Sequence, residues 1–211
     1  MRVLDRFKAF WQGIMLAPFI KLFIRLGISP DTVTIVGTVG ACAGALIFFP
    51  QGLLWQGVLF IVAFVFSDLI DGAMARTLGR KDTFGAFLDS TLDRIADGAI
   101  FAGLALYFAW VAEDRLYLCL SLVCLVMGSV TSYARSRGEG LGFNAKTGIA
   151  ERADRLVVIL ALTGFGDLLD LPILYEAALW FLAIASTITV LQRILLVRRQ
   201  ALDAVKPVER Q

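Results

Sequence analysis

Long apolar stretches, separated by short polar segments, run through most of the chain. A membrane-spanning helix needs about 20 mostly apolar residues, and six stretches are close to that length or longer. They are Thr32–Phe49, Leu53–Leu78, Phe84–Val111, Leu116–Ser132, Leu156–Leu171 and Leu174–Leu196. The pattern predicts an all-α integral membrane protein with six transmembrane helices. Because the connections are short, we expect one membrane domain over residues 1–211.

The first 27 residues differ from these stretches because basic side chains are distributed through them. Phe7, Phe10 and Phe19 separate from Arg2 and Lys8 at helical spacing. This pattern is typical of an amphipathic helix that lies along the membrane surface. We therefore expect an interfacial helix at 1–27, the six-helix bundle at 28–200 and a cytoplasmic tail at 201–211.

Charge is distributed unevenly between the two ends of the predicted spans. Hydrophobic residues make up 58% of the chain and the mean hydropathy is +0.77, as in a membrane protein. Lys and Arg gather on the N-terminal side of the bundle, with Arg115 as the exception, whereas Glu113, Asp167 and Asp170 lie on the opposite side. The positive-inside rule then places both termini in the cytoplasm of a multi-pass plasma-membrane protein. The lipid bilayer is the expected partner, and no nucleic acid is expected.

The stretch Ser67–Ala99 carries six acidic residues inside apolar surroundings. Its sequence predicts two helices joined by a polar turn. At about 100° per residue, Asp68 and Asp71 share one face of the first helix, and Asp89 and Asp93 share one face of the second. Carboxylate oxygens suit Mg²⁺, Mn²⁺ or Ca²⁺, and charges at membrane depth usually mark a function. The pattern predicts a divalent-metal site at the cytoplasmic edge.

Other kinds of catalytic chemistry have little support in this sequence. It contains no histidine, which excludes Ser-His and Cys-His catalysis, so the leading candidate for a side-chain base is a carboxylate. The three cysteines lie in apolar spans without CxxC spacing, and we expect them to serve packing. Asp97 lies one turn deeper than Asp93 and rotates away from the metal face. We expect it to be structural and paired with Arg94.

The acidic residues also follow a family signature. The pattern Asp68-x2-Asp71-Gly72-x2-Ala75-Arg76-x8-Gly85-x3-Asp89-x3-Asp93 resembles the motif of the CDP-alcohol phosphatidyltransferases at every fixed position. The resemblance implies transfer of a phosphatidyl group from CDP-diacylglycerol to an alcohol, with release of CMP. It further implies two Mg²⁺ ions, or Mn²⁺, held by the four aspartates, with Asp93 as the base that deprotonates the acceptor hydroxyl. The implied contacts to CDP-diacylglycerol are Asp31, Thr32, Val33, Thr34, Gly72, Ala75, Arg76, Asp82 and Gly85.

Shorter segments narrow the resemblance within this family. ISPDTVTIVG, SYARSRGE, IAERADRL and LQR are similar to segments of its actinobacterial phosphatidylinositol phosphate synthases. That similarity implies myo-inositol 1-phosphate as the acceptor, phosphatidylinositol phosphate as the product, and a homodimer. Gly37, Gly40 and Gly44 predict close helix packing, either within one chain or between two.

Several arginines gather on the side that holds the acidic residues. Arg135, Arg155 and Arg193 are candidates to bind the phosphate of the acceptor, because guanidinium groups bind phosphate well. Positive-inside topology and contacts with anionic lipids provide an alternative explanation for them.

Two alternative functions remain open at this point. The same arginines would suit glycerol 3-phosphate, which would make the chain a phosphatidylglycerophosphate synthase. A divalent-cation transporter is the more distant alternative. The outer halves of the spans are apolar and the carboxylates lie on one side only, which disfavours a conduction path.

Overall fold

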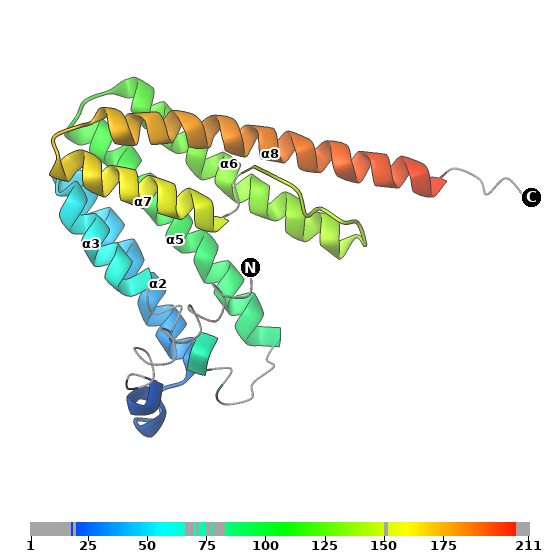
Figure 1. Cartoon of the computed structure of the whole chain (residues 1–211), viewed down its shortest axis with the longest axis horizontal. Helices are drawn as coiled ribbons and strands as arrows, with labels where there is room; N and C mark the ends of the chain where they lie inside the picture. The colour runs from blue at the N-terminus through cyan, green and yellow to red at the C-terminus, as the bar shows by residue number, and fades with distance from the viewer. Residues whose placement is uncertain are drawn as a thin grey trace, which may run out of the picture.

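A computed structural model of the chain describes residues 18, 20–65, 70, 72–74, 77, 83–149 and 152–205. Its regular elements are helices, with no strand among the described residues. They are α2 (Pro30–Phe48), the short 3₁₀ helix η1 (Phe49–Gln51), α3 (Leu54–Val65), α5 (Thr83–Trp110), α6 (Arg115–Gly140), α7 (Arg152–Leu168) and α8 (Ile173–Val205) (Figure 1). The prediction of an all-helical protein is thus confirmed for this part of the chain.

Each predicted span overlaps with one of these helices, but the helices differ in length from the predicted spans. Three helical segments, Pro30–Gln51, Arg115–Gly140 and Ile173–Ala204, are long and apolar enough to cross a membrane, and α3 is a shorter apolar helix. The amphipathic helix predicted for residues 1–27 lies mostly outside the described residues, although residues 20–25 are helical. These helices agree with a membrane protein.

Local sequence signals explain where several helices begin. The Ser29 hydroxyl accepts a hydrogen bond from the Thr32 amide at 3.2 Å, with Pro30 in the first turn. Asp114 caps α6 by accepting from the Leu116 amide at 2.8 Å. The first turn of α3 is capped from a distance, because the Trp55 amide donates to the carboxylate of Asp167 at 2.9 Å.

Two helices continue past the ends that hydropathy predicts. Helix α6 runs to Gly140 and α8 runs to Val205. At about 1.5 Å per residue, α8 is roughly 50 Å long, which exceeds the roughly 30 Å hydrocarbon core of a bilayer. Its C-terminal end extends away from α2 and α3 (Figure 1). The predicted tail is therefore helical up to Val205, because no residue before Pro207 breaks the helix.

In the part of the chain that the structure describes, helices α2, α3 and α5 to α8 form a closed ring of neighbours. Going round the ring, α2 contacts α5, α5 contacts α6, α6 contacts α8, α8 contacts α7, α7 contacts α3, and α3 returns to α2. The core inside it is apolar and includes Ile61, Ile100, Leu104, Ile159 and Leu179, all at most 1% exposed. In this order α5 and α7 stand opposite each other, a relation that matters for the site.

Small residues bring the first helices of the ring into close contact. A Cβ atom at Gly44 would lie 2.8 Å from Ile61 of α3, and one at Gly103 would lie 2.5 Å from the carbonyl oxygen of Ala45. Gly40 lies against Phe64 of α3 in the same way. Gly40 and Gly44 therefore serve packing within one chain, which is one of the two interpretations that the sequence allows.

Two glycines of α5 give a matched test of this packing. Gly103→Ala should lower the free energy of unfolding by about 1–3 kcal/mol, because the new methyl group meets backbone that cannot turn aside. Gly98→Ala should leave stability unchanged or raise it by about 0.5–1 kcal/mol, since no atom of another described residue lies within 4 Å of its Cβ position. The measurement is the Tm of each purified variant. Equal Tm values for the two variants would contradict the close contact between α2 and α5.

Candidate active site

Helix α5 carries three aspartates at four-residue intervals along one side. Asp89 is exposed, while the side chains of Asp93 and Asp97 are only 17% and 13% exposed. Gly85 precedes Asp89 by one turn and lies on the same side of the helix. The helical spacing that the sequence predicts for Asp89 and Asp93 is thus present, and it continues to Asp97.

Several predicted site residues lie outside the part of the chain that the structure describes. They are Asp68, Asp71, Ala75, Arg76 and Asp82. Gly72 is described, and no atom of another described residue comes within 4 Å of its Cβ position. Among the described residues there is no cluster of three or more acidic, histidine or cysteine side chains that could hold a metal. Only two of the four predicted ligands belong to this set, so the four-aspartate site stays a prediction.

An ion-pair cluster joins α5 to α7 across the ring. Arg152 bonds both carboxylates at once: its Nη2 lies 2.7 Å from Asp93 Oδ1 and its Nε lies 3.1 Å from Asp97 Oδ1. Arg155 approaches Asp97 Oδ2 to 3.6 Å. Arg94 lies 3.7 Å from Asp97, as the sequence predicts, and 3.8 Å from Asp93. Two carboxylates therefore face three guanidinium groups.

Arg155 and Arg193 are both buried, at 3% exposure each, and both donate to backbone carbonyls of α6. Arg155 Nη1 donates to Gly128 O at 3.2 Å, and Arg193 Nη1 donates to Thr131 O. Because residues 128 and 131 lie within one helical turn, the two guanidinium groups approach the same part of α6. The structure thus brings two of the three predicted phosphate ligands close to one stretch of backbone.

The third predicted phosphate ligand, Arg135, lies one turn beyond Thr131 on α6. Its side chain is 37% exposed and its Nε pairs with Glu139 at 3.1 Å. Next to Thr131 in the chain, Ser132 accepts a hydrogen bond from Arg94. This part of α6 therefore contacts the cluster through Ser132, while Arg135 lies at the outer margin of the cluster.

The loop between α6 and α7 is fixed over this region by α8. Arg193 Nε donates to Thr147 O at 2.9 Å, and the Ile149 amide donates to the Thr189 hydroxyl at 3.2 Å. Further along, Asn144 and Gln200 exchange two hydrogen bonds of 2.9 and 2.8 Å. Arg193 thus holds the loop as well as approaching α6.

At the start of α2, the residues predicted to contact the nucleotide divide into two pairs. Val33 and Thr34 are each 7% exposed, and the Thr34 hydroxyl donates to Pro30 O at 3.1 Å. Asp31 and Thr32 are more accessible. The side chains of the first pair therefore pack inward, and those of the second are open to a ligand.

The carboxylates of α5 fit the chemistry of a hard cation. Asp89 and Asp93 lie one turn apart on the same side, and oxygen ligands are those that Mg²⁺ and Mn²⁺ prefer. Arg152 is the contact that the sequence does not single out. Its position three residues before Arg155, on the same side of a helix, is the signal that could have indicated it.

Comparison with known proteins now bears on this site. The family model of CDP-alcohol phosphatidyltransferase matches residues 27–146. This chain belongs to the CDP-alcohol phosphatidyltransferase family. The matched range contains all four predicted metal ligands, whereas Arg152, Arg155 and Arg193 lie beyond it.

Two curated relatives resemble the chain over most of its length. The phosphatidylinositol phosphate synthase of Streptomyces avermitilis is 47% identical over 203 residues, which cover 93% of this chain and 83% of the relative. The enzyme of the same name from Cutibacterium acnes is 46% identical, covering 93% of this chain and 98% of the relative.

Solved structures of a phosphatidylinositol phosphate synthase from Mycobacterium tuberculosis share the fold. The structure with CDP-DAG bound has a TM-score of 0.83 and 41% identity, covering 87% of this chain and 93% of that one. The complex with manganese and citrate has a TM-score of 0.83 and 39% identity, covering 93% of each chain.

Proposed function

We propose that this chain transfers the phosphatidyl group of CDP-diacylglycerol to a hydroxyl of myo-inositol 1-phosphate, giving phosphatidylinositol phosphate and CMP. The observation that carries the proposal is the similarity to phosphatidylinositol phosphate synthases, 46–47% identical over 93% of this chain. One such enzyme binds CDP-DAG in its solved structure, and its fold matches this one with a TM-score of 0.83.

The four aspartates of the signature, Asp68, Asp71, Asp89 and Asp93, would hold two Mg²⁺ ions, or Mn²⁺. When bound, these ions would offset the charge of the pyrophosphate and of the departing CMP. The manganese complex of the tuberculosis enzyme supports this choice of metal. Asp31 to Thr34, together with Gly72, Ala75, Arg76, Asp82 and Gly85, would bind the nucleotide half of the donor.

Asp93 would take the proton from the acceptor hydroxyl, whose oxygen then attacks the phosphorus atom of the phosphatidyl group. Its Oδ1 is held by Arg152 at 2.7 Å, which fixes the direction of the carboxylate. A base must lie within hydrogen-bond reach of the proton it removes, so a fixed carboxylate favours the reaction.

Arg135, Arg155 and Arg193 would bind the phosphate of inositol 1-phosphate. Arg155 and Arg193 support this role because they bring two buried guanidinium groups to one turn of α6, beside the Asp93 cluster. Buried positive charge is stabilised by a dianion, and a guanidinium group can bond phosphate through two nitrogens. Arg135, at the outer margin, would complete the phosphate contacts.

An apolar cavity provides a place for the acyl chains of the donor. It lies between α3 and α7, has a volume of about 670 Å³, and extends from Trp55 and Leu168 to Val65 and Leu156. Its Leu156 end adjoins Arg155 and therefore the ion-pair cluster. A lipid with its head at the cluster could thus keep its hydrocarbon between apolar side chains, away from water.

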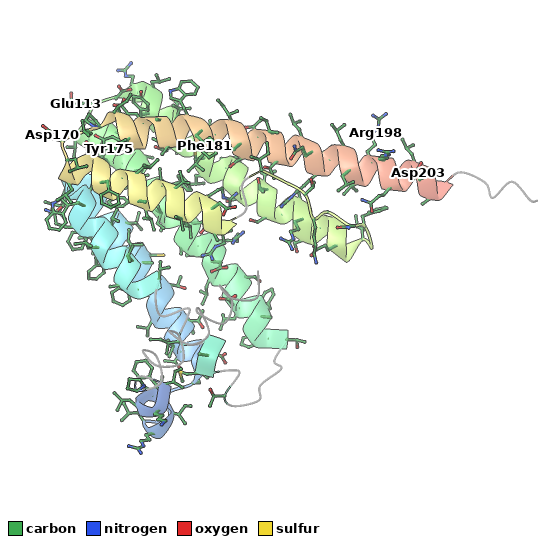
Figure 2. The ribbon with its side chains drawn as sticks, viewed as in Figure 1. Glu113, Asp170, Tyr175, Phe181, Arg198 and Asp203 are labelled. Atoms are coloured by element: carbon green, nitrogen blue, oxygen red, sulfur yellow. The ribbon has the colours of Figure 1, made fainter. Side chains whose placement is uncertain are left out.

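The membrane arrangement that suits this reaction has all six helices crossing the bilayer, with residues 1–27 along its surface. Both termini and the site would face the cytoplasm. Figure 2 shows Glu113 and Asp170 at the end of the bundle opposite to Arg198 and Asp203. The position of Arg198 supports this orientation, because the positive-inside rule counts Lys and Arg. We also propose that residues 1–211 form one domain and that the enzyme is a homodimer.

The metal proposal is tested by changing individual aspartates. Asp93→Asn should lower kcat by about 10²–10⁴-fold, the range expected for loss of a general base. Asp68→Asn, Asp71→Asn and Asp89→Asn should also remove activity, and excess chelator should stop the wild type. The assay is release of CMP from CDP-diacylglycerol. Asp154→Asn, an exposed acidic residue of α7, is the control. Full turnover in excess chelator would contradict the metal site.

The acceptor is tested by comparing three compounds. Inositol 1-phosphate should be used far better than inositol or glycerol 3-phosphate. Arg155→Gln and Arg193→Gln should each raise the KM for inositol 1-phosphate roughly ten- to hundredfold, the effect of one lost charge-assisted contact, with little change in the KM for CDP-diacylglycerol.

Arg198→Gln, at an exposed position on α8, is the matched control for these two substitutions. Because Arg193 also holds the loop at Thr147, the Tm of each variant is measured in parallel. Preferred use of free inositol, or unchanged KM values for inositol 1-phosphate in both buried variants, would contradict the proposal. Positive-inside topology and contacts with anionic lipids would then explain these arginines.

Membrane orientation is tested with single cysteines in a chain that lacks Cys42, Cys119 and Cys124. Lys146→Cys, next to the fully buried Ala145, should react with an impermeant thiol reagent only from the cytoplasmic side. Leu168→Cys, 57% exposed at the other end of the bundle, should react only from outside. The reverse pattern would place the active site on the outer face.

A further inference from the structure

Asp97 is not a residue of the signature, yet it forms the centre of the ion-pair cluster. Its Oδ1 bonds Arg152 at 3.1 Å, and its Oδ2 lies 3.6 Å from Arg155 and 3.7 Å from Arg94. At 13% exposure, its side chain is shielded from water. A carboxylate in such surroundings is stabilised by its cationic neighbours, and it restricts where each of them can lie.

Arg152 is the neighbour that links Asp97 to the proposed base. The same planar guanidinium bonds Asp97 through Nε and Asp93 through Nη2, at 3.1 and 2.7 Å. Because the guanidinium is rigid, a side chain held at Nε has its Nη2 directed at one place. Arg152 comes from α7, which stands opposite α5 in the ring, so these contacts fix Asp93 relative to a second helix.

Among the described residues, the other guanidinium groups near Asp97 have further contacts of their own or lie farther from Asp93 than Arg152 does. Arg155 is committed to the Gly128 carbonyl at 3.2 Å, and Arg94 donates to Ser132. Arg94 approaches Asp93 only to 3.8 Å, compared with 2.7 Å for Arg152. The short contact to Asp93 therefore depends on Arg152, and Arg152 depends on Asp97 for its orientation.

We propose that Asp97 is a positioning residue for the transfer reaction, acting through Arg152 to fix the carboxylate of Asp93. The proposal rests on the proposed function, in which Asp93 takes the proton from the acceptor. Asp97 itself touches neither substrate nor metal, and it acts by holding the guanidinium that holds the base.

Two substitutions separate this role from general stabilisation. Asp97→Asn should lower kcat by about ten- to hundredfold, the effect expected when a reacting group is misplaced by about 1 Å, while the KM for CDP-diacylglycerol changes little. Asp97→Glu, which keeps the carboxylate, should recover part of the lost kcat. Rates are expressed per folded molecule, and the exposed Asp154→Asn is the control.

Arg152→Lys tests the same link from α7, and it keeps the positive charge in case an Asp97 variant does not fold. One ammonium group cannot direct two nitrogens at both carboxylates, so kcat should fall as in Asp97→Asn. If Asp97 acts through Arg152, Asp97→Asn should lower kcat little further in an Arg152→Gln background. The proposal would be overturned if Asp97→Asn or Arg152→Lys kept the wild-type kcat. It would also be overturned if the loss of kcat in the double variant equalled the product of the losses in the two single variants.

Two further measurements do not depend on catalytic turnover. Mn²⁺ binding, followed by electron paramagnetic resonance without substrate, should weaken less in Asp97→Asn than in Asp89→Asn, because losing Asp97 displaces the ligand Asp93 without removing a ligand; a loss as large as in Asp89→Asn would overturn the proposal. The Tm of Asp97→Asn with Arg152→Gln should be no lower than that of the less stable single variant, and additive losses would show that the two side chains are not coupled. Failure of the proposed function is distinct, because the wild type would then release no CMP with inositol 1-phosphate.

Discussion

The ion pairs between α5 and α7 are the interaction on which the rest of the site depends. The two helices stand opposite each other in the ring, and Arg152 with Asp93 and Asp97 adds a direct polar link between helices that both contribute to the apolar core. Removing one member of a buried ion pair leaves the other charge uncompensated, which is costly in an apolar environment. The cluster therefore fixes the separation between α5, which presents the proposed base, and α7, which presents the proposed phosphate ligand Arg155.

The remainder of the bundle provides a rigid frame for these charges. Close contacts such as Gly103 against the Ala45 carbonyl hold α2 to α5, and the buried core around Ile100 and Leu179 holds the other neighbours. Packing is the main force between helices in a membrane, because the lipid tails are as apolar as the side chains. The core of this frame is apolar, and polar contacts such as the Asp93 cluster and the Asp167 cap of α3 lie outside it.

Separate apolar and charged regions suit a substrate that is part lipid and part polar. The apolar cavity between α3 and α7 adjoins the cluster at Leu156, so a hydrocarbon chain and a charged head group would meet neighbouring parts of one molecule. Arg155 joins the cluster to α6, because it approaches Asp97 and donates to Gly128. An enzyme that transfers a lipid phosphate to the hydroxyl of a soluble, phosphorylated acceptor needs both environments close together.

Local sequence determined the helices, the Ser29 cap of α2 and the four-residue spacing of Asp89 and Asp93, because these depend on period and on nearest neighbours along the chain. The resemblance of the aspartate motif further determined the family. Tertiary structure alone decided that Arg152 bonds both Asp93 and Asp97, and that Arg135 pairs outward with Glu139. It also decided that Asp167 caps α3 from more than a hundred residues away. The helical period determines which side of a helix a residue occupies. It does not determine which helix stands opposite, because that depends on how the described helices close into a ring.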